Sequence, residues 1–377
     1  MVTKTKITNP FSITSYIGND YFCGREAETK ELIDALYNRR NITLISPRKM
    51  GKTGLIRHVF EQINQRDAYC FYVDVYNTSN TREFTQTFAE TVLTKRLTPF
   101  SERIWKEISR FFSALRPVIS VDPITGQPLC TVDIQAERED ITLQQIFAYL
   151  EQADRRCYVA FDEFQTITEY SDNKIEATLR SHIQHLNNVQ FIFAGSKKHV
   201  MLQMFSAANR PFFQSTQLMS IGTIPEDVYY NFASSHLEAH KQQIDRASFH
   251  ELYDLVGGHT WYVQVILNRL YQSRIKEITY NDVLIVINQW LQEQTPVYQT
   301  YCRLLTIKQL AVMRAVAKEG IVSEPGKNSF LNKYAIGAYS TVRGALIALS
   351  DKELLYVDDD GSYSVYDKFW GIWLRYN

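Results

Sequence analysis

The stretch from Ile42 to Phe60 constrains the fold of this chain more than any other part of it. It reads I-T-L-I-S-P-R-K-M-G-K-T-G-L-I-R-H-V-F, a short apolar run, a turn, and then apolar residues at helical spacing. Residues 42–45 predict a buried strand, and the apolar residues from Leu55 onward predict a helix. A strand, a tight loop ending in Gly-Lys-Thr and a helix are the context that a phosphate-binding P-loop requires.

The predicted loop has the chemistry needed to hold a triphosphate. Its backbone N–H groups would surround the β- and γ-phosphates, Lys52 would face their oxygens, and the Thr53 hydroxyl would ligate Mg²⁺. Ser46 stands where the GxxxxGK[ST] pattern has its first glycine, which usually supplies a permissive backbone. The alternative is a chance Gly-Lys-Thr on a surface loop. The residues expected to contact the nucleotide here are Ser46, Pro47, Arg48, Lys49, Met50, Gly51, Lys52, Thr53 and Gly54.

The composition limits the partners and the compartment. The 377 residues allow two or three domains, and 41 Lys+Arg balance 41 Asp+Glu, which argues against a chain-wide grip on nucleic acid. Five cysteines without metal-ligand spacing are typical of free thiols in a reducing cytosol. The sequence has no signal peptide and no apolar run of the ~18–20 residues that span a membrane, so we expect a cytoplasmic protein.

A second motif ends a later apolar run. Residues 157–161, C-Y-V-A-F, predict a buried strand that closes on Asp162 and Glu163. This pattern resembles a Walker B motif, in which Asp162 would hold Mg²⁺ and Glu163 would polarise the attacking water as general base. An acidic turn after an apolar strand is the ordinary alternative. The alternating α and β patterns between this motif and the P-loop favour the nucleotide interpretation.

Residues 189–196, V-Q-F-I-F-A-G-S, predict another buried strand that ends on a small polar residue, Ser196. In α/β sheets, ligands lie outside the carboxyl ends of the strands. Because Ser46, Asp162 and Ser196 all follow such strands, we expect them at one edge of a sheet. Ser196 would contact the γ-phosphate or the attacking water, or it would be only a turn residue before a helix at 197–205.

Two arginines are candidates for stabilising charge on a transferring phosphoryl group. Arg180 is predicted on a helix after the acidic motif, and Arg210 lies in the loop N-R-P-F-F. Arginine presents a fork of donors that suits phosphate oxygens. The alternative for each is a solvated surface side chain.

The rest of the N-terminal part predicts elements around these motifs. Helices are expected at 26–36 and after Thr81, a strand at 68–75, and a further amphipathic helix at 104–115. Two alternating stretches around the turn P-I-T-G-Q-P predict a β-hairpin inserted at about 118–133.

From Pro225 onward the pattern becomes wholly helical, which predicts a helical lid subdomain at 223–300. His259 follows two glycines at a predicted helix start, where it would touch the nucleotide or only cap the helix. Residues 301–377 predict three helices and then a hairpin, the order of a winged helix. The recognition helix of that domain would carry a single basic residue, Arg343, and the tip of the wing, D-D-D-G, is acidic. Acidic wings repel phosphate, so a structural or protein-contacting role is favoured over DNA binding.

Together these motifs resemble the archaeal/bacterial ATPase family within the STAND branch of AAA+-like P-loop NTPases. The matching segments, in order, are F-C-G-R-E-A-E, S-P-R-K-M-G-K-T-G-L, F-D-E-F-Q, A-G-S, N-R-P-F-F, G-G-H-T-W-Y and Y-S-V-Y-D-K-F-W-G-I-W-L-R. The resemblance covers residues 18–375. It implies an α/β fold with an ASCE-type parallel sheet flanked by helices, a helical bundle and a winged helix.

The resemblance also implies roles for single residues. Gly24 and Arg25, with the glutamate after them, would lie near the adenine and ribose, and Ser196 would serve as sensor 1. The turn at Gly258 would match a G-x-P motif that reads the nucleotide state, although Thr260 stands in place of its proline. Members of this family act as ATP-dependent switches.

We therefore predict a Mg²⁺-dependent ATPase that works as a STAND or AAA+-like switch. Its α/β core would span 1–222, its lid 223–300 and its winged helix 301–377, with ATP between core and lid. The alternatives are an ATP-binding adaptor with negligible turnover and an ATP-regulated DNA-binding protein. The expected partners are ATP or ADP and a protein at the winged helix or lid, DNA is open but not favoured, an oligomer is open, and no membrane is expected.

Overall fold

The chain is described here from a computed structural model, which covers residues 9–64, 66–97, 108, 111–112, 115–121, 128–134, 138–172, 174–358 and 360–377. It divides into two compact units. One unit spans Thr14–Ile224, and the other contains Pro225–Asn377 together with the N-terminal residues up to Ile13.

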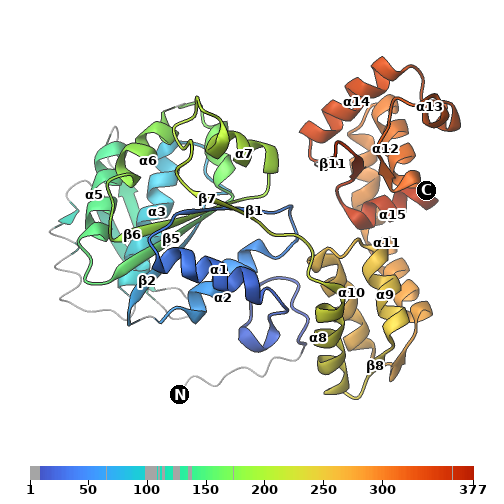
Figure 1. Ribbon diagram of the computed structural model, residues 1–377, viewed down its shortest axis with the longest axis horizontal. Coiled ribbons are helices and arrows are strands. Elements are labelled where there is room, and N and C mark those ends of the chain that lie inside the picture. Colours follow the sequence, from blue (N-terminus) through green and yellow to red (C-terminus); the bar gives the residue numbers. More distant parts are fainter. Residues whose placement is uncertain are drawn as a thin grey trace. The chain divides into compact units, whose positions relative to one another are not determined.

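A five-stranded parallel sheet forms the centre of the first unit (Figure 1). The strands, in their order across the sheet, are β2 (Ala68–Asp74), β5 (Arg156–Asp162), β6 (Val189–Gly195), β1 (Ile42–Ile45) and β7 (Gln217–Ser220). The P-loop strand β1 and the strand of the acidic motif, β5, are thus separated by β6, the strand that leads to Ser196. The predicted parallel sheet of a P-loop NTPase is confirmed.

Helices cover both faces of this sheet (Figure 1). Helices α1 (Glu26–Tyr37) and α2 (Lys52–Gln62) lie on one face, and α3 (Thr81–Arg96), α5 (Glu139–Glu151), α6 (Ile175–Ile183) and α7 (Lys198–Ser206) lie on the other. Along β6, Ile192 and Ala194 pack against the first group, whereas Phe191 and Phe193 pack against the second. A strand buried on both faces reads as a continuous apolar run, which is why β5 and β6 were predictable.

A two-stranded antiparallel sheet lies where the sequence predicts a hairpin, with β3 at Leu115–Val121 and β4 at Pro128–Ile134. The residues between these strands, 122–127, lie outside the described part of the chain. The helix predicted at 104–115 also lies mostly outside it, and its last residue begins β3 instead of ending a helix. Two short 3₁₀ helices, η1 (Asn19–Tyr21) and η2 (Phe164–Glu169), complete this unit.

The second unit begins with helices α8 (Glu226–Glu238), α9 (Arg246–Leu255), α10 (Thr260–Ser273) and α11 (Tyr280–Arg303). The prediction of a wholly helical segment was wrong in one respect, because β8 (Gln243–Ile244) pairs in parallel with β9 (Glu277–Ile278). The side-chain amide of Gln242 donates to the carbonyls of Leu270 and Ile275, both at 3.0 Å. These hydrogen bonds tie the residue before β8 to α10 and to the segment between α10 and β9. A two-residue strand leaves no periodic pattern in a sequence.

The C-terminal part of this unit is a winged helix, as predicted. Its elements are α12 (Ile307–Glu319), β10 (Ile321–Val322), α13 (Asn328–Tyr334), α14 (Tyr339–Asp351), β11 (Leu355–Val357), β12 (Tyr363–Val365) and α15 (Lys368–Tyr376). The three strands form an antiparallel sheet in the order β10-β12-β11. The domain boundaries expected at 222 and 300 stay predictions, and α11 runs through the second of them.

Across the described residues, no helix combines the length and the apolar character that crossing a membrane requires.

Candidate functional site

The P-loop joins β1 to α2. The backbone turns at Lys49 and Gly51, where φ is 67° and 93°, and the helix begins at the next residue, Lys52. The left-handed conformation at Gly51 is one that glycine adopts without strain. Ser46 does not have a positive φ, and its N–H donates to the Gly195 carbonyl at 3.2 Å. A serine therefore fits the position where the general pattern has its first glycine.

Lys52 and Thr53, at the start of α2, meet the acidic residues at the end of β5. The Nζ atom of Lys52 lies 3.1 Å from Asp162 Oδ1 and 2.9 Å from Glu163 Oε1. The Thr53 hydroxyl donates to Asp162 Oδ2 at 2.6 Å. Lys52 and Asp162 are 6% and 2% exposed, so water screens this charge pair little. The structure brings together the four residues predicted to serve phosphate, metal and water.

Glu163 is held at both carboxylate oxygens. Its backbone is left-handed, with φ 56°, and Oε1 faces Lys52. Oε2 accepts hydrogen bonds from the Ser196 hydroxyl at 2.7 Å and from the Gln165 amide at 2.6 Å. The Ser196 N–H donates to Gln165 Oε1 at 3.3 Å. Ser196, the last of the predicted strand-end residues, is therefore joined to the acidic motif.

Gln165 is a site residue that the sequence does not reveal. It is 2% exposed, and its amide bridges Glu163 and Ser196. Its position depends on β5 and β6 lying side by side, which no local pattern around F-D-E-F-Q encodes. The one signal in the sequence is that Gln165 follows Glu163, the predicted general base, by two residues.

The charges of the acidic residues follow from their surroundings. Burial opposes ionisation of Asp162, but the Lys52 ammonium and neighbouring hydroxyl donors outweigh burial and lower the pKa of Asp162. Burial also opposes ionisation of Glu163, whose pKa is likewise lowered by Lys52 and by hydrogen bonds. The pKa of Asp74 is raised, mainly by burial and further by the nearby carboxylates Asp162 and Glu163. Asp162 and Glu163 are therefore ionised at neutral pH.

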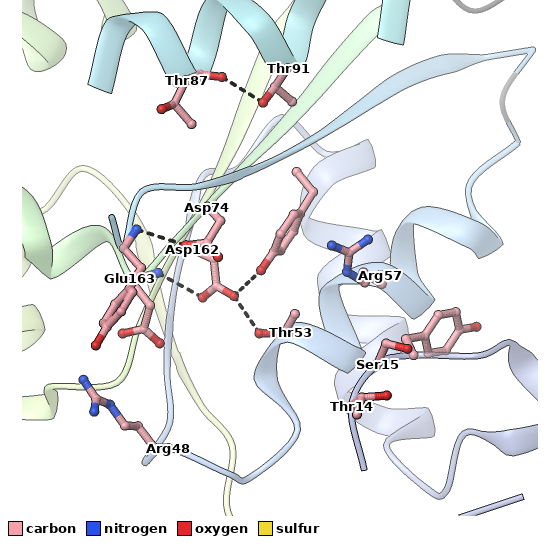
Figure 2. Close-up of a pocket in the computed structure, with 13 residues that line it drawn as sticks. Thr14, Ser15, Arg48, Thr53, Arg57, Asp74, Thr87, Thr91, Asp162 and Glu163 are labelled. Atoms are coloured by element: carbon pink, nitrogen blue, oxygen red, sulfur yellow. Dashed lines mark hydrogen bonds between the residues drawn. The ribbon is translucent and has the colours of Figure 1, made fainter. Parts of the chain in front are cut away.

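A cavity of about 870 Å³ opens beside these residues (Figure 2). Predicted residues that line it are Arg48, Thr53, Asp162 and Glu163. Residues that line it without having been predicted are Thr14, Ser15, Tyr16, Arg57, Tyr72, Asp74, Tyr76, Thr87 and Thr91. The cavity thus extends from Thr53, at the start of α2, toward β2 and α3.

One signal in the sequence pointed to this extension. Tyr72 and Asp74 alternate along the predicted strand 68–75, so their side chains share one face. In the structure Asp74 is the register partner of Asp162, at the end of the neighbouring strand. The sequence could therefore have indicated Asp74, because this carboxylate ends the predicted strand 68–75 just as Asp162 ends the strand of the acidic motif.

Arg25 supports the P-loop backbone. It is buried, its guanidinium donates to the Met50 carbonyl at 3.2 Å and also to the Gly222 carbonyl, and it pairs with Glu28 at 2.9 Å. Arg25 therefore ties the loop to the segment that follows β7. The contact with adenine and ribose that the resemblance implies for Gly24 and Arg25 stays a prediction.

Two arginine candidates do not line the cavity among the described residues, and a third candidate, His259, lies in the other unit. Neither Arg180 nor Arg210 is among the described residues that line the cavity. Arg210 forms an ion pair with Glu176, and Arg180 lies half-buried on the same helix as that glutamate. His259 belongs to the second unit, where it precedes α10 without making the side-chain cap hydrogen bond of that helix. The phosphate and nucleotide roles of these residues stay predictions.

The fold and the site define a class of protein. A parallel sheet whose P-loop lysine faces two carboxylates at the end of a nearby strand, followed by a winged helix, is the architecture of an ATP-binding P-loop ATPase. The chain belongs to the family of ATPase domains found predominantly in archaea, whose model matches residues 22–266. A second model, a probable winged helix domain, matches residues 296–376.

Known proteins similar to this chain agree with that assignment. An uncharacterized ATP-binding protein of Methanocaldococcus jannaschii, MJ0147, is 22% identical over 291 residues, which cover 73% of this chain and 74% of that protein. The Walker-type ATPase PABY2304 of Pyrococcus abyssi is 16% identical with a TM-score of 0.65, over 97% of this chain and 99% of that one. The ORC2 protein of Aeropyrum pernix, solved in ADPNP–ADP complexes, is 11% identical with a TM-score of 0.59, over 97% of each chain. At these identities the solved structures support the fold alone.

Proposed function

We propose that this protein binds ATP together with Mg²⁺ at the carboxyl edge of its sheet and hydrolyses the ATP. The observation that carries the proposal is the meeting of Lys52 and Thr53 with Asp162 and Glu163, at distances between 2.6 and 3.1 Å. One segment supplies a cation and a hydroxyl, and the other supplies two carboxylates. Phosphoryl transfer needs these groups around one phosphate.

The loop and Lys52 would hold the triphosphate. Backbone N–H groups in the first turn of α2 have no partner within the helix, and they lie at its positive end. The Lys52 ammonium would exchange its two carboxylate contacts for phosphate oxygens. Because Lys52 is buried, that exchange would take place with little screening by water.

Thr53 and Asp162 fit a Mg²⁺ ion. Hydroxyl and carboxylate oxygens are hard ligands, and Mg²⁺ in nucleotide sites takes one or two protein groups beside water and phosphate. In the described part of the chain, no group of three or more His, Cys, Asp or Glu side chains could hold a metal. The Mg²⁺ site formed by Thr53 and Asp162 would therefore fill only together with the nucleotide, whose phosphates supply further ligands. The ion would neutralise charge on the phosphate oxygens.

Glu163 would act as the general base. Its lowered pKa keeps it ionised at neutral pH, so it can accept a proton from water. Ser196 and Gln165 hold Oε2, which fixes the direction of the carboxylate. Water activated there would lie at the same edge of the sheet as Lys52 and Thr53.

Hydrolysis would drive a switch of the STAND or AAA+-like kind. Ser196 contacts Glu163, and α7 begins at Lys198, so a change at the γ-phosphate would reach a helix within two residues. In this proposal the γ-phosphate holds one arrangement of the chain, and hydrolysis releases it.

We propose a protein partner for the winged helix. Its recognition helix, α14, contains a single basic residue, Arg343, and the segment between β11 and β12 carries Asp358 and Asp360. One similar structure, the ORC1 protein of Aeropyrum pernix at 12% identity and a TM-score of 0.54, was solved in complex with DNA. The acidic wing would repel a phosphate backbone, so we favour protein over DNA for this chain.

The cytoplasm is the proposed compartment. Cys23, Cys70 and Cys157 are free thiols, and burial raises the pKa of each to about 12. Such thiols stay protonated and unreactive. Free cysteines, two of them buried and Cys70 half-buried, suit a reducing environment.

A second candidate function follows from Glu163. Both of its oxygens have partners in Lys52, Ser196 and Gln165, so the base is restrained where it lies. This favours an ATP-binding adaptor with negligible turnover.

Phosphate release from ATP by the purified protein, measured with Mg²⁺ and with EDTA, separates the ATPase from the adaptor. Oligomer size measured in the same samples shows whether assembly accompanies either function. Mg²⁺-dependent release supports the ATPase, whereas bound ATP without release supports the adaptor.

A further inference from the structure

We propose that Tyr72 is a positioning residue whose hydroxyl holds Asp162 in the orientation that binds Mg²⁺. The inference rests on the proposed function and concerns a residue outside the P-loop and the acidic motif. Tyr72 lies on β2, the edge strand next to β5. Its hydroxyl donates to Asp162 Oδ2 at 2.6 Å.

Asp162 accepts two polar contacts on each carboxylate oxygen from the described residues. Oδ1 accepts the backbone N–H of Glu163 at 3.0 Å and faces Lys52 Nζ at 3.1 Å. Oδ2 accepts the hydroxyls of Thr53 and Tyr72, both at 2.6 Å. The carboxylate is therefore surrounded by four donors, arranged in two pairs.

Under the proposed function, two of the four donors would leave Asp162 for other partners and two would stay. Lys52 would turn to the phosphates, and Thr53 would give an oxygen lone pair to the metal. The two donors without such a task are the Glu163 N–H on one oxygen and the Tyr72 hydroxyl on the other. Together they fix the rotation of the carboxylate, and Tyr72 is the side chain that does so.

The ring of Tyr72 is itself held in place. The Arg57 guanidinium lies over it, 4.3 Å from the ring centroid, a cation–π contact that restrains the ring. The register of β2 with β5 pairs Asp74 with Asp162, so Tyr72 approaches from two residues earlier on the same face. Strand pairing and stacking therefore direct the hydroxyl to the carboxylate.

Hydrogen bonds to a metal-binding carboxylate typically change metal affinity by 10- to 100-fold when they are removed. Loss of the Tyr72 hydroxyl would leave Oδ2 with the Thr53 hydroxyl as its side-chain donor, and Thr53 is the group recruited by the metal. We expect Mg²⁺ to bind about tenfold more weakly. ATP binding measured in EDTA should stay unchanged, because Tyr72 donates to Asp162 and not to the P-loop.

Tyr72→Phe tests the inference, because phenylalanine keeps the ring under Arg57 and removes the hydroxyl alone. A matched control is Tyr69→Phe. Tyr69 lies on the same strand, donates to Asp154 at 3.1 Å and has Arg96 over its ring at 4.3 Å, but it does not line the cavity. Two readouts apply: the Mg²⁺ concentration that half-saturates ATP hydrolysis, and Mn²⁺ binding to the ADP complex measured by electron paramagnetic resonance.

We expect Tyr72→Phe to raise the half-saturating Mg²⁺ concentration and the dissociation constant for Mn²⁺ about tenfold each. Turnover at saturating Mg²⁺ should stay within about twofold of wild type, and Tyr69→Phe should change neither metal affinity. Unchanged Mn²⁺ and Mg²⁺ affinities in Tyr72→Phe would overturn the inference. The inference would also be overturned if Tyr72→Phe lost ATP affinity in EDTA by the same factor as it lost metal affinity, since that result marks a general structural role. Failure of the proposed function shows separately, as a wild-type protein that binds no ATP in either condition.

Discussion

The Thr53 hydroxyl donates a 2.6 Å hydrogen bond to Asp162 Oδ2, although 109 residues separate the two in the sequence. The contact joins the first turn of α2 to the end of β5 and sets two hard oxygen ligands side by side. Lys52 adds a cation next to the same carboxylate. This arrangement is the physical basis for the proposal that Mg²⁺ and phosphate share one pocket.

Glu163→Gln should retain ATP and lose turnover. Glutamine keeps the shape of the side chain but cannot take a proton from water, and a general base contributes 10²- to 10⁴-fold to a rate. We expect phosphate release to fall at least about 100-fold. The control is Glu169→Gln, an exposed glutamate that pairs with Lys197. Hydrolysis of ATP by Glu163→Gln at the wild-type rate would show that the assigned base is wrong.

Ser196→Ala should lower kcat more than it changes KM. The serine hydroxyl donates to the Glu163 carboxylate, and a hydrogen bond to a charged group contributes about 1.5–3 kcal/mol. Steady-state kinetics should therefore show a loss in kcat of about tenfold or more. Ser181→Ala, on the exposed side of α6, is the control. A raised KM with normal kcat would instead place Ser196 in ground-state binding.

Gly195→Ala should destabilise the first unit. A Cβ at this position would overlap the side chains of Met201 and Gln165, so the core on one side and the amide bridge to Glu163 on the other must shift. Overpacking of this kind costs about 1–3 kcal/mol in the free energy of unfolding, measurable by denaturant titration.

Gly344→Ala is the matched control for that change. Open space surrounds this glycine on α14, and alanine favours helix by about 1 kcal/mol, so the variant should be as stable as wild type or more stable. Equal stability of Gly195→Ala and wild type would contradict the close packing at the end of β6.

Acid should remove the stabilising effect of Asp162. Its pKa is lower in the folded than in the unfolded chain, where an aspartate has a pKa of about 3.9. The stabilisation is therefore complete above about pH 4 and is lost as the pH falls through the folded pKa. The difference in denaturation midpoint between wild type and Asp162→Asn should be largest near neutral pH and should shrink below about pH 4. A constant difference over that range would contradict the charge pair with Lys52.

The sequence predicted those parts of the site that leave a local pattern. β1, β5 and β6 are buried on both faces. β5 ends on Asp162, and a serine follows each of β1 and β6, so the apolar runs and the strand-end rule located Ser46, Asp162 and Ser196. The edge strand β7 lacks this signal, because its residues Q-L-M-S alternate with only Met219 buried. The sequence therefore predicted no strand at these residues.

The parts that escaped prediction depend on contacts across strands and helices. Tyr72 reaches Asp162 through the register of β2 with β5, and Gln165 reaches Ser196 through the pairing of β5 with β6. Arg210 was a candidate for phosphate from its loop position, and the ion pair that it forms with Glu176 on α6 could not be foreseen from that position. Spacing along a single segment cannot encode such neighbours.

The central claim is that Lys52 and Asp162 serve one Mg²⁺–ATP pocket, and calorimetric titration of ATP with Mg²⁺ or EDTA tests it most directly. Wild type should bind ATP more tightly with Mg²⁺. Lys52→Ala should lose ATP binding in both conditions, and Asp162→Asn should keep binding in EDTA but gain nothing from Mg²⁺. Undiminished ATP affinity in Lys52→Ala, or a wild-type response to Mg²⁺ in Asp162→Asn, would contradict the account.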